Sequence, residues 1–151
     1  MSSLPLKADS AFNAGELEGY LHTMTIPMRL ACLGSNGFPL VASHWYRYQD
    51  GELFSALHQN SLVARHLREN PRCSFEIAAD TLPYRGARGQ GIAHLHREGA
   101  GECLEQLIVR YLGDTDSKLA QWLLSRRNEE YMVRITPRWI TSWDFTERMG
   151  R

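Results

Sequence analysis

Residues 29–57 read RLACLGSNGFPLVASHWYRYQDGELFSAL, and this stretch decides the fold. It contains two dipeptides, Asn36-Gly37 and Asp50-Gly51, that strongly favour tight turns between antiparallel strands. An apolar run precedes the first turn, and another follows the second turn over 53–57. The stretch therefore predicts three consecutive strands in a meander, of which the middle one ends at about Tyr48.

Two helices flank this meander in the sequence. Asn13 followed by Glu16 is typical of a capping box, so a helix is expected to start there and to end before Pro27. Ser61 is a good N-cap for a second helix, which Asn70-Pro71 should end. Both helices are too short to form a layer of their own, so we expect them to pack against the strands.

The second half of the chain continues the antiparallel pattern. A long strand is expected over 87–97, with a bulge at Gly89 and Gly91 because glycine weakens regular strand pairing. Pro137 is expected to separate two final strands. The remaining predicted elements are a strand over 73–79, helices around 104–112 and 119–123, and the final strands over 131–135 and 139–143. These elements predict a mainly β protein with peripheral helices, in which about seven antiparallel strands close into a barrel.

The composition is that of one ordinary intracellular domain. The chain has 151 residues, so we expect a single domain over 1–151 with a flexible tail over 1–13. Lys and Arg total 17 and Asp and Glu total 17, and this neutral balance argues against a nucleic-acid or membrane partner. No apolar run reaches the ~18 residues of a membrane span. Three cysteines without a CxxC pair are typical of reduced thiols in a cytoplasmic protein.

Motifs of hydrolytic and nucleotide-dependent enzymes are absent from the sequence. The chain has no GxSxG, no HExxH and no Walker glycine loop. His94 and His96 would share one strand face, but no third ligand follows at a metal-binding spacing. We therefore expect no catalytic side chain of these classes and no metal site.

The segment from Ser55 to Arg65 is more informative. Ser61 opens a helix, and the free N–H groups at the start of a helix bind phosphate. Arg65, one turn into that helix, and Arg29, at the start of the first strand, can supply countercharges. From spacing alone the other interpretation is equally good, namely that Ser61 only caps the helix and the arginines are solvated.

These residues resemble the pyridoxamine 5'-phosphate oxidase-like family of FMN-binding split barrels. The resemblance covers about residues 14–146, and its weight comes from the order and spacing of several short motifs. Those motifs are Arg29-Leu-Ala-Cys-Leu, the Asn-Gly hairpin, Asp50-Gly51 with Leu53-Phe54-Ser55, Asn60-Ser61, Arg65-His-Leu-Arg-Glu-Asn-Pro71, Pro83-Tyr84-Arg85-Gly86, and Pro137 with Ser142-Trp143-Asp144.

The resemblance implies an antiparallel split barrel of six or seven strands that forms a homodimer. It also implies one FMN at each of two sites in the subunit interface, and an oxidoreductase acting on a small molecule. The phosphate would lie at Arg29, Ser61 and Arg65, and the ring near Ser43 and Trp45. Trp143 would come from the partner chain. The other implied cofactor contacts are Leu30, Ala31 and Cys32 in the first strand and Ser55 at the end of the third.

One departure from the family pattern leaves alternatives open. The family commonly has Arg-Lys directly after the helix-opening serine, where this chain has Leu62 and Val63. Either Arg29 and Arg65 compensate, or the cofactor binds more weakly, or the site takes another ligand. A non-catalytic flavin-binding or sensing and stress dimer is one alternative function. A deazaflavin-dependent reductase is another, although its long anionic tail would need a basic groove that a neutral chain does not indicate.

Overall fold

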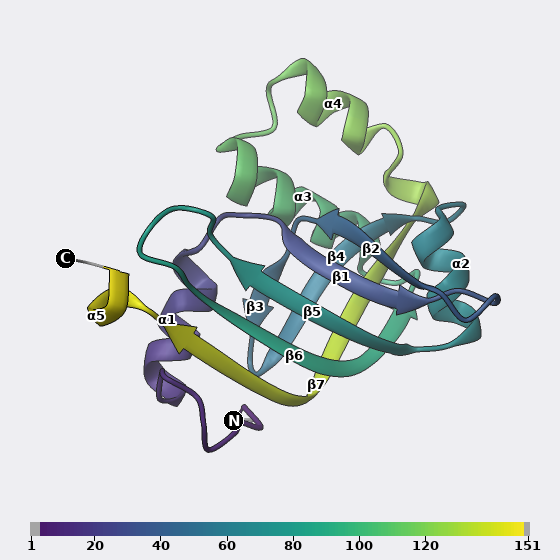
Figure 1. Ribbon diagram of the computed structural model, residues 1–151. Coiled ribbons are helices and arrows are strands. Elements are labelled where there is room, and N and C mark those ends of the chain that lie inside the picture. The colour runs from purple at the N-terminus through teal and green to yellow at the C-terminus, as the bar shows by residue number, and fades with distance from the viewer. Residues whose placement is uncertain (1–3, 150–151) are drawn as a thin grey trace.

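The computed structural model describes residues 4–149 and shows a single curled sheet with helices outside it (Figure 1). All strand pairs are antiparallel, and the strand order is β2-β1-β5-β6-β7-β4-β3. The prediction of a mainly β protein with about seven strands is confirmed. The strands are β1 (Met28–Leu33), β2 (Pro39–His44), β3 (Arg47–Gln49), β4 (Glu52–His58), β5 (Arg72–Ala78), β6 (Arg85–His96) and β7 (Glu130–Asp144).

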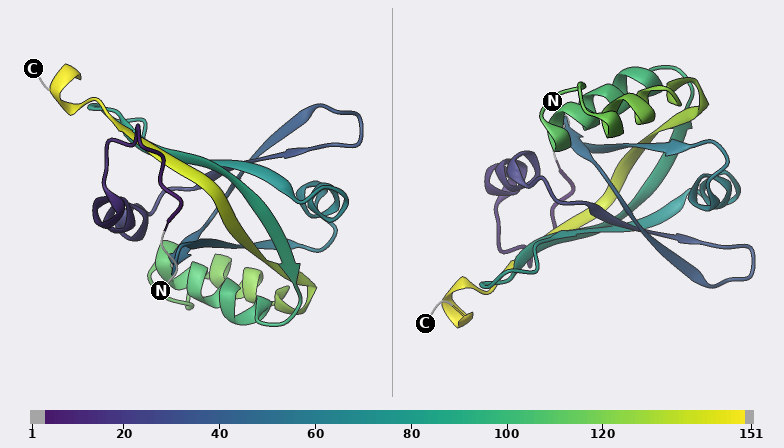
Figure 2. Two further views of the ribbon diagram at one scale, coloured as in Figure 1. Left: turned by 90° about the horizontal axis from the view of Figure 1, so that it is seen from below. Right: turned by 90° about the horizontal axis from the view of Figure 1, so that it is seen from above.

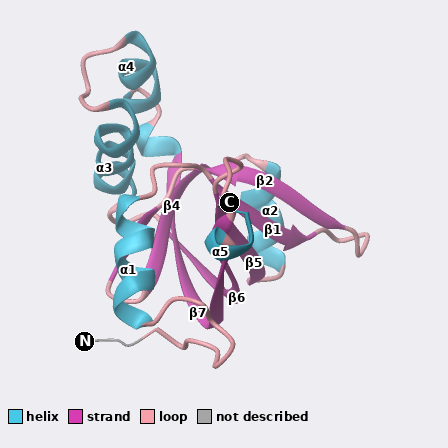
Figure 3. Cartoon of the chain, turned by 60° about the vertical axis from the view of Figure 1, so that its left-hand side comes forward, coloured by secondary structure: helices cyan, strands magenta, loops and turns pink. Residues whose placement is uncertain are grey.

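The helices surround the sheet on different sides. Helix α2 lies at one end of the barrel, whereas α3 and α4 form a separate layer on the side of β4 (Figure 2 and Figure 3). The capping box predicted at Asn13 and the N-cap predicted at Ser61 are both present. The helices are α1 (Ala14–Thr23), α2 (Leu62–Glu69), α3 (Ala100–Leu112), α4 (Lys118–Leu124) and α5 (Thr146–Met149), with a short 3-10 turn at Arg127–Glu129.

Strand β7 corrects the prediction of two final strands separated by Pro137. It runs unbroken, and the bulge expected near Gly89 and Gly91 explains why. Gln90 pairs with Trp139 and Gly91 with Pro137, so Arg138 is the extra residue of the bulge. A bulge tolerates the missing N–H of proline.

Position 89 in strand β6 requires a glycine because the backbone of β7 comes close to it. A Cβ atom added to Gly89 would lie 2.4 Å from the carbonyl oxygen of Trp139 and 2.6 Å from the ring of Phe75.

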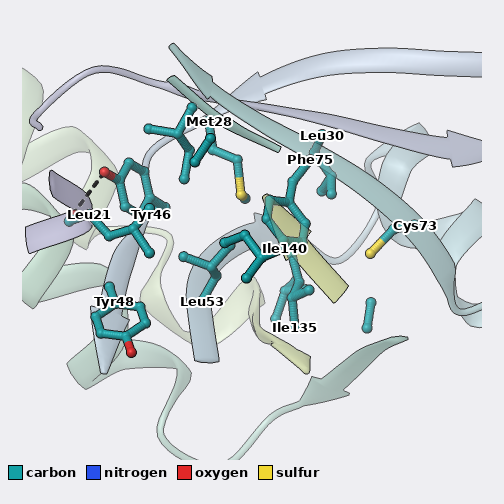
Figure 4. Packing of buried hydrophobic residues seen from close by; sticks show 14 of the residues in the cluster. Leu21, Met28, Leu30, Tyr46, Tyr48, Leu53, Cys73, Phe75, Ile135 and Ile140 are labelled. Atoms are coloured by element: carbon teal, nitrogen blue, oxygen red, sulfur yellow. Dashed lines mark hydrogen bonds between the residues drawn. The ribbon is translucent and has the colours of Figure 1, made fainter. Parts of the chain in front are cut away.

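The second strand of the meander is interrupted, which the sequence did not predict. Trp45 and Tyr46 lie between β2 and β3, outside regular strand pairing. The Tyr46 N–H donates to the hydroxyl of Tyr111 at 3.2 Å instead of to a neighbouring strand. Its own hydroxyl donates to the carbonyl of Leu21 at 2.9 Å (Figure 4). It also donates to the carbonyl of Met24 at 2.8 Å, so tertiary contacts replace the strand ladder here.

Residues 4–13 do not extend as the tail that was predicted over 1–13; residues 1–3 lie outside the described part of the chain. This segment runs along the end of β7 that extends beyond its pairing with β4. The N–H of Lys7 donates to the carbonyl of Ile140 at 2.9 Å, and that of Ala11 to Ser142 at 3.1 Å. Leu4 and Phe12 are buried. The burial of these two large apolar side chains holds the segment against the sheet.

The apolar interior has two parts of unequal size. The larger, which we call the barrel core, fills the inside of the sheet and includes Leu30, Tyr46 and Ile135 (Figure 4). The smaller, which we call the helix-side cluster, lies between β4, α3 and α4 and has Leu104, Ile108 and Ala120 as its buried members. The three cysteines are buried and unpaired, as predicted. No helix among residues 4–149 is long and apolar enough to cross a membrane.

Candidate functional site

A cavity of about 290 Å³ lies between the sheet and the helix-side cluster. Ser43 and Trp45, which were predicted to contact a ring, both line it. Its apolar walls come from α3, α4 and β4, and two titratable groups complete it. We call it the helix-side cavity, and its lining residues are Ser43, His44, Trp45, Ala56, Leu104, Leu107, Leu119, Leu123 and Glu130.

The Trp45 side chain is held as a fixed wall of this cavity. Its ring stacks on that of Tyr111, with a centroid distance of 5.0 Å and an angle of 6° between the planes. The buried hydroxyl of Ser55 donates to the Trp45 carbonyl at 2.8 Å. Ser55 was predicted as a cofactor contact. In the structure its hydroxyl instead stabilises the backbone at Trp45, in the break between β2 and β3.

Two polar groups of the cavity have buried atoms without a protein partner. Glu130 is only 6% exposed, and its Oε2 accepts no hydrogen bond. Burial raises the pKa of this carboxyl, against the opposing effects of Arg126 and His58. The buried Nε2 of His44 is also unpaired, and burial lowers the pKa of this imidazole. Both shifts favour the uncharged form, so the cavity offers neutral hydrogen-bonding groups set in apolar walls.

No local pattern in the sequence pointed to these two groups. A glutamate at the start of a strand is typical of a solvated residue, and an isolated histidine such as His44 is typical of a core or an interface. Their importance comes from the α3 and α4 layer, which covers them. An unsatisfied buried polar group costs about 1–3 kcal/mol, which a ligand can recover.

At the start of α2, the role of Ser61 as a helix cap is compatible with a role at a phosphate site. Its hydroxyl accepts from the N–H of Ala64 at 3.1 Å, so the residue does cap the helix. The amides of the first turn remain directed out of the helix end. Leu62 is 47% exposed and Val63 is buried, and neither brings a charge. Arg65 lies exposed on the same helix.

The predicted residues of β1 are divided between two faces. Leu30 and Cys32 point into the barrel core, whereas Arg29 and Ala31 lie on the outside of the sheet. Arg29 faces Ser43 across the β1–β2 pair. It is distant from α2, because α2 meets the other end of β1, where Gly34 lies beside His66; five residues of strand span about 16 Å. Within one chain, Arg29 therefore lies at the opposite end of β1 from the helix that carries Ser61 and Arg65.

Arg29 instead lines a long depression on the outer face of β1, β5 and β6. Two cavities of about 450 and 400 Å³ adjoin there and share the residues Ala31, Ser74 and Gln90. We call them together the outer-face groove. Four arginines line the groove, namely Arg29, Arg72, Arg88 and Arg138, against one carboxylate, Glu76. None of the four arginines forms an ion pair with any residue in 4–149.

Cys32 and Cys73 pair across β1 and β5 beneath this groove, and both are buried members of the barrel core. Burial raises the pKa of both thiols, that of Cys73 to about 12. They are therefore protonated at neutral pH and poor nucleophiles.

Trp143, predicted as a contact from the partner chain, lies near the far end of the same face. It is half-buried in β7, and the guanidinium of Arg88 lies 5.3 Å from its ring centroid. Together with Asp9 and Phe145 it lines a further cavity of about 420 Å³, which shares Arg88 with the outer-face groove. The predicted residues are thus divided among the helix-side cavity with Ser55 behind it, the start of α2, the barrel core, and the outer face of one chain.

Comparison with known proteins places the chain by its structure. No family model and no curated protein sequence matches it. A solved structure of a conserved hypothetical protein from Mycobacterium tuberculosis is similar to it with a TM-score of 0.76 and 27% identity, over 92% of this chain and 89% of that one.

Two further similar structures carry descriptions of function. One is an F420 reductase, with a TM-score of 0.69 and 16% identity over 81% of this chain and 94% of that one. The other is a putative pyridoxamine 5'-phosphate oxidase from Listeria innocua, with a TM-score of 0.63 and 17% identity over 84% of this chain and 98% of that one. At this level of identity the likeness shows the fold, and it agrees with the strand order above. The chain is a pyridoxamine 5'-phosphate oxidase-like split barrel, a fold found in flavin-binding proteins and in an F420 reductase.

Proposed function

We propose that this protein is an oxidoreductase that uses a flavin-type cofactor, with FMN as the first candidate, and acts on a small molecule. The helix-side cavity is the observation that carries the proposal. Its walls are apolar, Trp45 is fixed by stacking, and its lining residues include His44 and Glu130, each of which has an unpaired buried atom. A flat ring system with polar edge atoms fits these features, since it would fill the apolar space and pair both orphan groups.

The roles of the residues follow from their surroundings. A bound flavin supplies hydride or electron transfer, and the protein supplies binding, orientation and exclusion of water. Trp45 and the leucines of α3 and α4 keep the cavity dry. His44 and Glu130 orient the ring through hydrogen bonds. The amides that open α2 after Ser61, together with Arg65, hold the phosphate.

We also propose that the functional unit is a homodimer with two composite sites. The β1–β2 hairpin projects beyond the barrel (Figure 2 and Figure 3). It exposes three large apolar side chains, Leu33 at 40%, Phe38 at 74% and Val41 at 63%. Contact with a second copy would bury this surface. Arg29 and Trp143 of the outer face would then act on the cofactor held by the other chain.

Filling the cavity tests the assignment of the ring. Ala56→Leu adds side-chain volume inside the helix-side cavity, and we expect it to weaken FMN binding by at least about tenfold, as measured by quenching of tryptophan fluorescence. The matched control is Ala14→Leu, the same change on the exposed first turn of α1, which should leave the affinity unchanged. Equal affinity in a folded Ala56→Leu variant would place the ring elsewhere.

A deazaflavin is the second candidate, and the outer-face groove favours it. Although the net charge of the chain is zero, four arginines and a single carboxylate line the outer-face groove. The groove is therefore basic, as the binding of a polyanionic tail requires. We expect Arg72→Gln/Arg138→Gln to weaken F420 binding strongly and FMN binding little if F420 is the cofactor. Arg148→Gln, on α5, is the control. Equal loss for both cofactors, or no loss, would argue against this candidate.

A further inference from the structure

Two arginines outside the sites described above converge on one tyrosine. Arg68 Nη1 donates to the hydroxyl of Tyr131 at 3.2 Å, and Arg97 Nη2 donates to the same oxygen at 3.4 Å. Their guanidinium carbons lie 5.6 and 4.3 Å from the Tyr131 ring centroid. The three residues come from α2, from the end of β6 and from the start of β7, so the cluster exists only in the folded chain.

The positive charge of this pair has no ion-pair partner among residues 4–149, although Glu69 and Glu98 are the sequence neighbours of the two arginines. A guanidinium carries five N–H donors in a planar fork, and the Tyr131 hydroxyl takes one from each arginine. Most N–H donors of the two guanidinium groups therefore stay available to a ligand. The two groups carry the same charge and share one neutral oxygen, that of Tyr131. An oxyanion with several acceptor atoms complements this arrangement.

The cluster lies next to the start of α2. The same Nη1 of Arg68 donates to the carbonyl of Gln59 at 3.2 Å, two residues ahead of the cap Ser61. The Arg68 side chain thus runs back along the helix toward its N-terminus. An anion there would meet the guanidinium groups and the positive end of the helix dipole together.

We propose that Arg68 and Arg97, with Tyr131 between them, form a phosphate-binding site that supplies the positive charge absent at Leu62 and Val63. The ligand class is a phosphate monoester. That its source is the phosphate of the cofactor rests on the function proposed above; the site itself does not.

The experiment compares phosphate binding by the full-length chain and its variants. Inorganic phosphate is titrated by calorimetry, with the wild type, Arg68→Gln/Arg97→Gln, and the single variant Arg97→Gln, at a position where the arginine donates to Tyr131 and lies over its ring. The matched control is Arg148→Gln, because Arg148 also lies over an aromatic ring, that of Phe145 at 5.6 Å. We expect phosphate affinity to fall by at least about tenfold in the double variant, less in the single variant, and not in the control.

Unchanged phosphate affinity in the folded double variant, or no phosphate binding by the wild type, overturns the site. A second titration with FMN and riboflavin identifies the source of the phosphate. If the site holds the cofactor, the double variant loses FMN affinity and keeps riboflavin affinity. Loss of phosphate binding with unchanged FMN affinity supports the site but assigns it to another phosphate ester. A protein that binds phosphate and no flavin rejects the proposed function and keeps the site.

Discussion

The barrel core and the helix-side cluster lie on two sides of the same sheet and are built differently. In the barrel core the buried hydroxyls have partners: that of Tyr46 donates to two carbonyls, and that of Tyr20 to the carbonyl of Ile77 at 3.0 Å. The helix-side cluster has three buried apolar members, a cavity, and orphan atoms on His44 and Glu130.

This difference indicates that the barrel core mainly stabilises the fold, whereas the helix-side cluster mainly serves function. Native interiors pair nearly all their buried polar groups, so a region that fails to do so calls for an explanation. A sheet that only needed stability would pack both faces as the barrel core is packed. A ligand in the helix-side cavity would pair the orphan atoms of His44 and Glu130, and the comparison can be tested by changes made on each side.

The largest expected effect is on the side of the barrel core. Leu30→Ala empties a fully buried position and should lower the free energy of unfolding by about 2–5 kcal/mol. Leu123→Ala, at a half-buried position in the wall of the helix-side cavity, should cost about 1 kcal/mol because the space around it is already open. Urea unfolding measures both. Equal losses would show that the two regions are packed alike.

Two serine caps give an intermediate effect and a matched pair. Ser61 caps α2, and Ser117 caps α4 by accepting from the N–H of Ala120 at 3.1 Å. Each Ser→Ala change should cost about 1 kcal/mol of stability. We expect Ser61→Ala also to weaken FMN binding by about 1–3 kcal/mol, since it removes a polar group at the phosphate end. If Ser117→Ala weakens FMN equally, Ser61 acts through stability alone.

The smallest expected effect is a pH dependence at Glu130. Burial raises the pKa of this carboxyl in the folded chain, so its contribution to stability is present below the ordinary pKa of glutamate. That contribution is lost as pH rises through the raised value. Glu130→Gln stays uncharged and should therefore raise Tm by a few degrees at about pH 8 and by less at about pH 4. The same Tm difference at both pH values would contradict the burial of this carboxyl.

Local signals in the sequence were sufficient for most of the fold. The turns at Asn36-Gly37 and Asp50-Gly51, the caps at Asn13 and Ser61, and the bulge near Gly89 each depend on backbone chemistry that a few neighbouring residues determine. The continuous β7 was missed because Pro137 pairs at that bulge, which only the register of two distant strands defines. The break at Trp45 and Tyr46 was missed for the same reason, since Tyr111 causes it from 65 residues away.

The site was less predictable than the fold. Net charge could not show that Arg29, Arg72, Arg88 and Arg138 line one groove, because the sheet brings together residues from four strands. In the sequence, Arg68 and Arg97 are ordinary solvated charges, and their meeting at Tyr131 depends on the barrel closing. The burial of Glu130 depends on the layer formed by α3 and α4.

The central claim is that the chain binds a flavin-type cofactor at composite sites in a homodimer. Light scattering combined with visible absorbance of the purified protein, with FMN or F420 added in excess and the unbound cofactor removed, measures mass and bound cofactor together. The account predicts a dimer that retains one cofactor per chain. A monomer that retains neither cofactor would contradict it.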